Sequence, residues 1–281
     1  MDIYHIFAGF LVGFLVGLTG VGGGSLMTPI LLMFFNQPAA VAVGTDLLYA
    51  AITKSVGIFA HGKLGNINWR IVGLLALGSV PASIITTAYL GNMDMSSDSA
   101  VATIKFWLGI ALMLTSLSVI FRIQLAKLSK NGHWLNPAYA PPLTIILGVS
   151  LGFLVTLTSV GAGALGVTAL LILYPQISIS RIIGTDIAHA VPLTLVAGLG
   201  HVSLGTVDYT LLGTLLIGSI PGIWLGSHLS TKVAEQWIRF ILAIILVYVG
   251  QKLAFPAFSA IVGIGVLLAI IAFKEINGRE T

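Results

Sequence analysis

Three charged residues, Asp46, Lys54 and Asp186, stand within otherwise apolar stretches of the chain. A Gly-Thr pair precedes each aspartate, and Lys54 follows Asp46 by eight residues, which would place the two on one face of a helix. Such side chains could pair, exchange protons or, for Lys54, bind an anion. Simpler roles remain open: Asp or Thr could cap a helix start, and Lys54 could only neutralise Asp46.

Histidines add groups that titrate near neutral pH. His189 follows Asp186 by three residues and would share its helical face. His61 and His201 match in two similar halves of the chain, and each could carry a proton at a gate. The alternative for this pair is a hydrogen bond at an interfacial helix end. Asp46, Asp186 and these three histidines are the candidates for coupling or gating.

Two glycine clusters could bind an anion without a formal charge. Residues 20–24 contain four glycines followed by Ser25, and Gly161 and Gly163 form a second cluster. Glycine costs about 1 kcal/mol in a helix relative to alanine. A functional reason would be a helix that unwinds and restarts with its amide N–H groups aimed at an anion; the alternative is close helix packing. The predicted substrate-binding residues are Gly22, Gly23, Gly24, Ser25, Thr45, Lys54, Gly161, Gly163 and Thr185.

Several kinds of chemistry have no support in the sequence. The absence of cysteine excludes disulfides and thiolate metal sites, and the histidines lack metal-ligand spacing. No Lys-Ser or Lys-Thr pair follows the glycines, so they do not form a nucleotide loop. We find no nucleophile with a base and no cofactor motif, and therefore expect no enzyme activity, metal or cofactor. The net charge of +4 suits basic membrane loops and does not indicate a nucleic-acid partner.

Composition identifies the elements that must position these residues. Of 281 residues, 57% are hydrophobic and 8% are charged, and the mean hydropathy is +1.05. Soluble domains have about 25% charged residues. The apolar stretches 71–90, 101–121, 208–229 and 237–255 each reach the roughly 20 residues of a spanning helix. We therefore predict an all-α polytopic membrane protein.

The chain repeats itself after about 140 residues, which indicates a duplication. The matched segments are 13–24 with 152–163, 44–46 with 184–186, 61–65 with 201–205, and 78–81 with 218–221. Two positions depart from the match. Ala162 stands where the first cluster has a glycine, and Thr194 stands where the first half has Lys54.

The first segment of each half, residues 3–35 or 142–174, is too long for one simple span. It could cross the membrane once as a broken helix, or turn at its glycines as a hairpin. The positive-inside rule favours the hairpin, which leaves only Lys105 and Lys252 of the basic loop residues outside; a single crossing divides them evenly. A hairpin and three spans make an odd number of crossings, so the second half would be inverted.

The predicted organisation has four parts. They are a first repeat at residues 1–121, a cytoplasmic linker loop at 122–141, a second, inverted repeat at 142–255, and an additional C-terminal helix and tail at 256–281. The C-terminus would be cytoplasmic. Inverted repeats with interrupted helices are typical of secondary transporters that bind their substrate near the midplane.

The motifs in residues 20–24, 44–54 and 61–70 resemble those of the TauE/SafE sulfite exporters, a TSUP-type family of anion transporters. The resemblance covers roughly residues 9–229. It implies a bacterial inner-membrane carrier for sulfite, thiosulfate, an organosulfonate or another small organic anion, coupled to an ion gradient. The departures at Ala162 and Thr194 suggest unequal roles for the two half-sites.

We therefore predict a secondary transporter of a small anion that uses alternating access, with the lipid bilayer as its surroundings and protons as a candidate coupling ion. A passive anion channel is the alternative and would need a continuous pore. A membrane enzyme acting on a sulfur compound is disfavoured by the missing motifs. The sequence leaves the anion, the direction of transport, the coupling ion and the oligomeric state open.

Overall fold

The computed structural model describes residues 3–19, 24–63, 65–131, 137–229, 235–258 and 265, and these parts are helical with connecting turns. The α-helices of the first half are α1 (Ile3–Thr19), α2 (Gly24–Met33), α3 (Ala39–Lys63), α4 (Trp69–Gly91) and α5 (Asp98–Asn131). Those of the second half are α6 (Ala140–Thr158), α7 (Leu165–Leu173), α8 (Ile179–Ser203), α9 (Tyr209–Leu229) and α10 (Glu235–Ala254). Short 3-10 turns occupy Pro137–Tyr139 and Pro256–Phe258. The described residues contain no strand, which confirms the all-α fold class.

The surface of this bundle is suited to lipid. Within the described residues, five helices are long and apolar enough to cross a membrane: α4, the Asp98–Arg122 part of α5, α6, α8 and α9. Large apolar side chains such as Leu77, Ile85 and Trp224 are exposed, whereas threonines and serines such as Thr115 and Ser116 are buried. A soluble protein would place these side chains the other way round, because its surface meets water.

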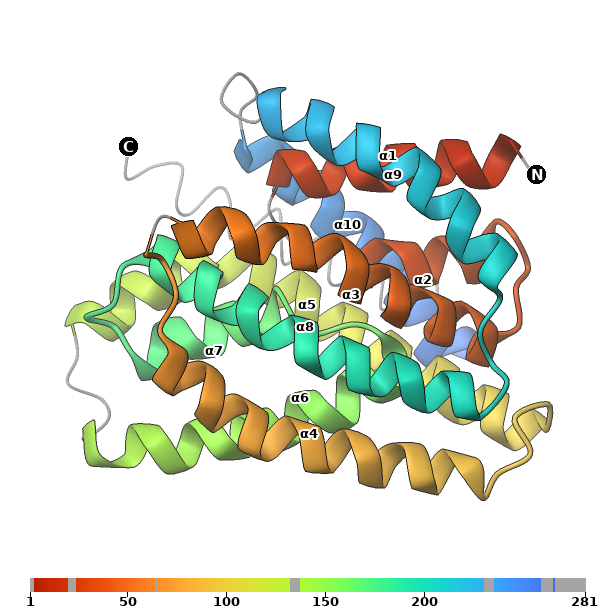
Figure 1. The fold of residues 1–281 in the computed structure, drawn as a ribbon, viewed down its shortest axis with the longest axis horizontal. Coiled ribbons are helices and arrows are strands. Elements are labelled where there is room, and N and C mark those ends of the chain that lie inside the picture. Colours follow the sequence, from red (N-terminus) through yellow and green to blue (C-terminus); the bar gives the residue numbers. More distant parts are fainter. Residues whose placement is uncertain are drawn as a thin grey trace.

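In each half one helix ends beside the glycine cluster and another begins at or just after its last glycine, and the backbone between them is described for the second half. In the second half, α6 ends at Thr158 and α7 begins at Leu165, and Ser159, Gly161 and Gly163 have φ angles of 59°, 125° and 119°. Such backbone conformations suit glycine. In the first half, α1 ends at Thr19 and α2 begins at Gly24. Figure 1 shows α2 returning toward the edge of the molecule at which α1 begins.

Helices of one half pack against helices of the other: α1 lies on α9, α6 on α4, α5 on α10 and α3 on α8. Glycines allow the first two pairs to approach closely. A Cβ at Gly13 of α1 would overlap the backbone of Ser219 in α9, and a Cβ at Gly152 of α6 would overlap the backbone of Ser79 in α4. Gly13 matches Gly152 and Ser219 matches Ser79 in the sequence repeat. The two contacts are therefore equivalent.

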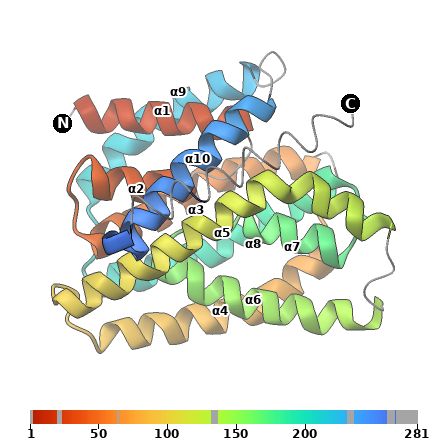
Figure 2. The same cartoon turned by 180° about the vertical axis from the view of Figure 1, so that it is seen from behind.

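Equivalent helices run in opposing directions across the molecule. In Figure 1, α1 begins at the right-hand edge, beside the N-terminus, whereas α6 begins at the left-hand edge. The view from behind in Figure 2 shows the same relation with left and right exchanged. The central pair, α3 and α8, also lies antiparallel: Gly44 of α3 approaches His201 near the end of α8, and Gly198 approaches Leu48.

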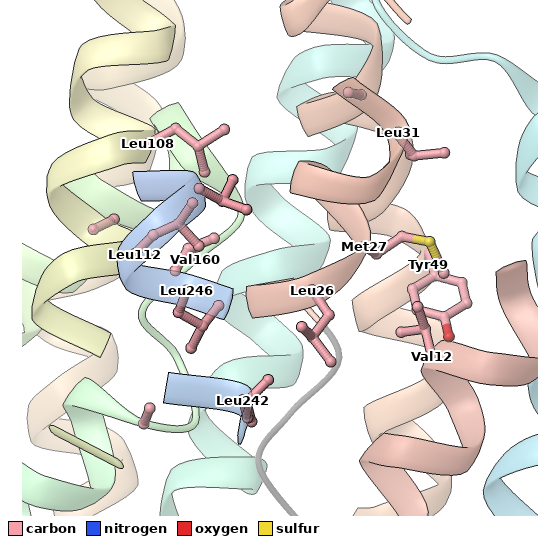
Figure 3. Packing of buried hydrophobic residues seen from close by; sticks show 14 of the residues in the cluster. Val12, Leu26, Met27, Leu31, Tyr49, Leu108, Leu112, Val160, Leu242 and Leu246 are labelled. Carbon is pink, nitrogen blue, oxygen red and sulfur yellow. The ribbon is translucent and has the colours of Figure 1, made fainter. Parts of the chain in front are cut away.

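The largest apolar cluster joins the two interrupted segments to the helices around them. Figure 3 shows Leu26, Met27 and Leu31 of α2 near Tyr49 of α3 on one side, with side chains of α5 and α10 on the other. Val160, in the interruption between α6 and α7, belongs to the same cluster and is fully buried. The second interruption is therefore part of the core.

One predicted boundary falls within a helix, and one predicted helix lies almost entirely outside the described residues. The linker was expected from residue 122, but α5 continues to Asn131, so the first part of that linker is helical. The additional C-terminal helix predicted for residues 256–281 lies outside the described residues, apart from the turn Pro256–Phe258 and residue 265.

Candidate functional site

The side chain of Asp46, in α3, is hydrogen-bonded to α2. Its side chain is fully buried, and Oδ2 accepts hydrogen bonds from the backbone N–H of Thr28 at 3.2 Å and from the Thr28 hydroxyl at 2.5 Å. Asp46 lies about two turns inside α3, which begins at Ala39, so it does not cap its own helix. The carboxylate instead satisfies polar groups of the short helix after the first interruption.

Asp186 has the matching position in α8 but different contacts. It is fully buried, and Oδ1 occupies the place where a Cβ at Gly166, in the first turn of α7, would stand. Neither carboxylate oxygen receives a well-formed hydrogen bond from the described residues. Its polar neighbours are the Gly163 backbone N–H and the charge of Lys54. Thr168, the counterpart of Thr28, also has no hydrogen-bond partner for its hydroxyl among those residues.

Lys54 reaches from α3 to the interruption in the other half of the chain. Its side chain is 8% exposed, and Nζ donates a hydrogen bond of 3.1 Å to the backbone carbonyl of Ala162. The charges of Asp186 and Asp46 both act on this ammonium group. A lysine ammonium has three donors, so two remain for a carboxylate or a bound anion. Lys54 therefore does more than neutralise Asp46.

The interruption itself is anchored by side chains around it. The hydroxyl of Thr158 accepts from the backbone N–H of Val160 at 3.1 Å, and Ser118 of α5 donates to the carbonyl of Ala164 at 3.2 Å. Ser159, which interacts with Asp46, is buried as well. The unwound backbone after α6 is thus hydrogen-bonded to its surroundings beside the charged residues.

Thr45 and Thr185, both predicted to contact substrate, bind the backbone of the opposite half. The Thr45 hydroxyl accepts from the N–H of Asp208 at 3.0 Å, and the Thr185 hydroxyl accepts from the N–H of Asn68 at 2.9 Å. Asp208 and Asn68 precede α9 and α4, and each accepts a hydrogen bond from the first turn of its helix. In this conformation the two threonines fix the starts of α9 and α4.

His189 lies with the charged residues. Its Nε2 is 2.8 Å from the hydroxyl of Ser79, while Nδ1 has no hydrogen-bond partner among the described residues. The charge of Lys54 acts on this imidazole. The equivalent position in the first half holds Tyr49, whose hydroxyl lies near Ser219, the counterpart of Ser79, without a well-formed hydrogen bond.

His201 is fully buried, and both of its ring nitrogens have hydrogen-bond partners. Its Nδ1 lies 2.8 Å from the hydroxyl of Thr206, and its Nε2 lies 3.0 Å from the backbone carbonyl of Thr156. Because a carbonyl only accepts, Nε2 carries a hydrogen and Nδ1 can accept from Thr206. This places His201 at a buried helix end. The side chain of its partner, His61, lies outside the described residues.

The predicted glycine cradle is only partly within the described structure. Gly22 and Gly23 lie outside it, as do the side-chain surroundings of Ser25, while Gly24 begins α2. Gly161 and Gly163 are described and adopt the positive φ angles given above. Thr28 of α2 and Gly166 in the first turn of α7 contact the carboxylates of Asp46 and Asp186, respectively.

Several contributors were not predicted. Thr28, Ser79 and the backbone carbonyl of Ala162 complete the contacts of Asp46, His189 and Lys54. A signal for two of them exists in the repeat, since Thr28 matches Thr168 and Ser79 matches Ser219. A backbone carbonyl leaves no such signal.

The structure gathers Lys54, Asp46, Asp186 and His189 near the second interruption. Thr45 and Thr185 instead bond to the residues before α9 and α4, and His201 bonds to the last turn of α6. Buried positive and negative charges beside unwound backbone suit the binding and release of a small ion. Within the described residues, no group of three His, Asp or Glu side chains could hold a metal ion.

Comparison with known proteins identifies the family. The family described as sulfite exporter TauE/SafE matches residues 5–253. Probable membrane transporter protein YjnA of Bacillus subtilis is 42% identical over 255 residues, which cover 90% of this chain and 100% of that protein. Probable membrane transporter protein MJ0441 of Methanocaldococcus jannaschii is 30% identical over 262 residues, covering 87% of this chain and 92% of the relative. No solved structure matches the chain significantly. The chain belongs to the TauE/SafE sulfite exporter family and is a multi-pass membrane transporter.

Proposed function

We propose that this transporter is a secondary carrier of a small anion, namely sulfite, thiosulfate, an organosulfonate or a related organic anion, in the cytoplasmic membrane. The observation that carries the proposal is the position of Lys54. This buried cation reaches from α3 into the unwound segment between α6 and α7, where it donates to the carbonyl of Ala162. A single ammonium group between two halves suits an anion bound at their interface.

The binding residues follow from this position. Lys54 supplies charge, and the backbone at Gly161 and Gly163 supplies amide donors beside it. Gly22, Gly23, Gly24 and Ser25 remain proposed contacts on the first-half side. Thr45 and Thr185 would contact the anion only after releasing the N–H groups of Asp208 and Asn68.

Burial of the charged residues favours a carrier over an open channel. Lys54 is 8% exposed, and Asp46, Asp186 and His189 are fully buried. An anion can reach them only if the helices move, which is the behaviour of alternating access, whereas a conducting channel needs a continuous pore.

The opposing directions of α1 and α6 in Figures 1 and 2 support the inverted-repeat arrangement that such carriers use. The moving units would not be the two halves of the sequence. Because α1 is packed on α9 and α6 on α4 through glycines, each unit would combine helices of both halves. The sliding surface would lie where these pairs meet the central helices α3 and α8.

Protons are the proposed coupling ion. Asp46, Asp186 and His189 lie near Lys54 and are the candidates for carrying this proton. His201 and His61 would act as gates nearer the two membrane faces. The C-terminus would lie on the cytoplasmic side, as the distribution of basic loop residues favours.

Uptake into proteoliposomes tests the proposal. The purified protein is reconstituted, and uptake of labelled sulfite, thiosulfate and methanesulfonate is followed with and without a pH gradient, with protein-free liposomes as control. Saturable uptake with counterflow of a preloaded anion is expected. Unsaturable flux would indicate a channel, and no flux of any anion through folded protein would overturn the proposal.

A further inference from the structure

The geometry points to Asp186 as the residue that takes up one proton together with each transported anion, while Asp46, its counterpart in the repeat, remains an ionised structural carboxylate. This inference rests on the proposed function and assigns its coupling step to one side chain. The observation behind it is the difference between the contacts of the two aspartates.

The two carboxylates share a sequence context and a depth in their helices but not their hydrogen bonds. Both follow Gly-Thr, and both are fully buried. Asp46 receives two hydrogen bonds from Thr28, each of which stabilises its ionised form. Asp186 receives no well-formed hydrogen bond on either oxygen from the described residues. A proton added to Asp186 therefore disturbs only its contact with the backbone N–H of Gly163, whereas neutralising Asp46 at its unbonded Oδ1 would weaken the two hydrogen bonds that Oδ2 accepts from Thr28.

Lys54 supplies the main opposing charge at Asp186. Its ammonium group already donates to Ala162 and is shared with Asp46. An anion that binds Lys54 takes the remaining donors and offsets its charge. Lys54 then neutralises the negative charge of the buried Asp186 carboxylate less fully. The carboxylate therefore gains affinity for a proton. By linkage, a proton on Asp186 strengthens anion binding by the same factor.

The other charged and titratable groups of the neighbouring helices do not take the place of Asp186 in binding this proton. From α3, Asp46 and Lys54 face the site, and the side chains of His61 and Lys63 lie outside the described residues. From α4, Arg70 is exposed. Helices α6 and α7 contain no charged side chain or histidine. On α8 itself, Arg181 is exposed and His189 is bound to Ser79.

The balance of charges also indicates that anion binding favours protonation of Asp186. Lys54, Asp46 and Asp186 in their ionised forms carry one net negative charge, and a bound monoanion would add a second to a buried region. One proton from the solvent on Asp186, converting the carboxylate to a neutral carboxylic acid, restores the charge that the empty site had. No covalent bond other than this O–H forms or breaks.

The test compares two rates in proteoliposomes with methanesulfonate, a monoanion that stays ionised near neutral pH. Exchange is measured with the same anion on both sides and no gradient, and accumulation is measured with an inward pH gradient. We expect the wild type to do both. Asp186→Asn, which resembles the protonated state, should still exchange but should accumulate no anion above the equilibrium level. Asp46→Asn should slow both processes and leave their ratio as in the wild type.

The outcomes separate the two proposals. Gradient-driven accumulation by Asp186→Asn would overturn the coupling role and leave the carrier intact, and loss of exchange in folded Asp186→Asn would make Asp186 an anion-site residue instead. If this variant does not fold, proton uptake by the wild type on anion addition, followed with a pH indicator in weak buffer, decides the point. About one proton per bound monoanion is expected, and none would overturn the inference. A wild type that neither exchanges nor accumulates any anion would overturn the proposed function itself.

Discussion

Lys54 in the first half of the chain donates a hydrogen bond of 3.1 Å from Nζ to the backbone carbonyl of Ala162, in the interruption of the second half. The two halves differ at both positions, since Thr194 stands where the first half has Lys54, and Ala162 stands where it has a glycine. The asymmetry at these two positions therefore meets in one contact. The first half supplies the ammonium group, and the second half supplies the backbone carbonyl to which it donates.

Gly166→Ala should destabilise the protein and impair transport, because the new methyl group would occupy the place of Asp186 Oδ1. Overpacking of this kind costs about 1–3 kcal/mol. The control is Gly213→Ala in α9, where a methyl group would meet open space; an alanine there should be neutral or stabilise the helix by up to about 1 kcal/mol. Thermal unfolding in detergent checks the pair, and equal midpoints would contradict the contact between Gly166 and Asp186.

Thr28→Val should lower stability more than Thr168→Val, although the two threonines match in the repeat. The first change removes a hydroxyl donor from the buried Asp46 carboxylate, and such losses cost about 1–3 kcal/mol. The hydroxyl of Thr168 has no hydrogen-bond partner among the described residues, so its removal should cost little. Denaturant or thermal unfolding of both variants measures the difference. Equal losses would mean that Asp46 and Asp186 are held alike.

Thr45→Val and Thr45→Ser separate a structural role from substrate contact. Valine leaves the N–H of Asp208 without its acceptor, at a cost of about 1 kcal/mol, while serine keeps the hydroxyl. The serine variant should match the wild type in unfolding midpoint, and the valine variant should unfold earlier. A valine variant of unchanged stability but raised KM for uptake would instead make Thr45 a substrate contact.

Gly13→Val and Gly152→Val should each disturb the packing between the two halves. A side chain at Gly13 would overlap the backbone of Ser219, and one at Gly152 would overlap that of Ser79, with backbone in the way in both cases. Because neither backbone can move aside locally, we expect reduced yield of folded protein in size-exclusion chromatography. Gly73→Val, which meets open space, is the control. Normal folding of both test variants would contradict the close packing of α1 on α9 and α6 on α4.

Much of the fold could be predicted because lipid imposes simple rules on sequence. Long apolar stretches indicate spanning helices, and the glycines at 161 and 163 mark the break between α6 and α7. The extent of α5 was less predictable, since its polar continuation to Asn131 lacks the apolar pattern of a span. Helix propensity rather than hydropathy governs that part of the chain.

The residue types of the site were predictable, but their partners were not. A buried lysine and two buried aspartates are conspicuous in an apolar chain, and Lys54, Asp46 and Asp186 were identified on that basis. Their different environments depend on Thr28 and on the carbonyl of Ala162, which only the packing brings close. The repeat places Asp46 and Asp186 at matching positions, and tertiary contacts give them different hydrogen bonds.

The most direct measurement of the central claim is saturable anion uptake into proteoliposomes by the wild type, Lys54→Met and the matched second-half variant Thr194→Val. Methionine keeps most of the side-chain length and removes the charge. The account predicts that Lys54→Met loses uptake by at least about tenfold, the factor that corresponds to 1.4 kcal/mol, while Thr194→Val stays near the wild type. Uptake by folded Lys54→Met at the wild-type rate and KM would contradict an anion site built around Lys54.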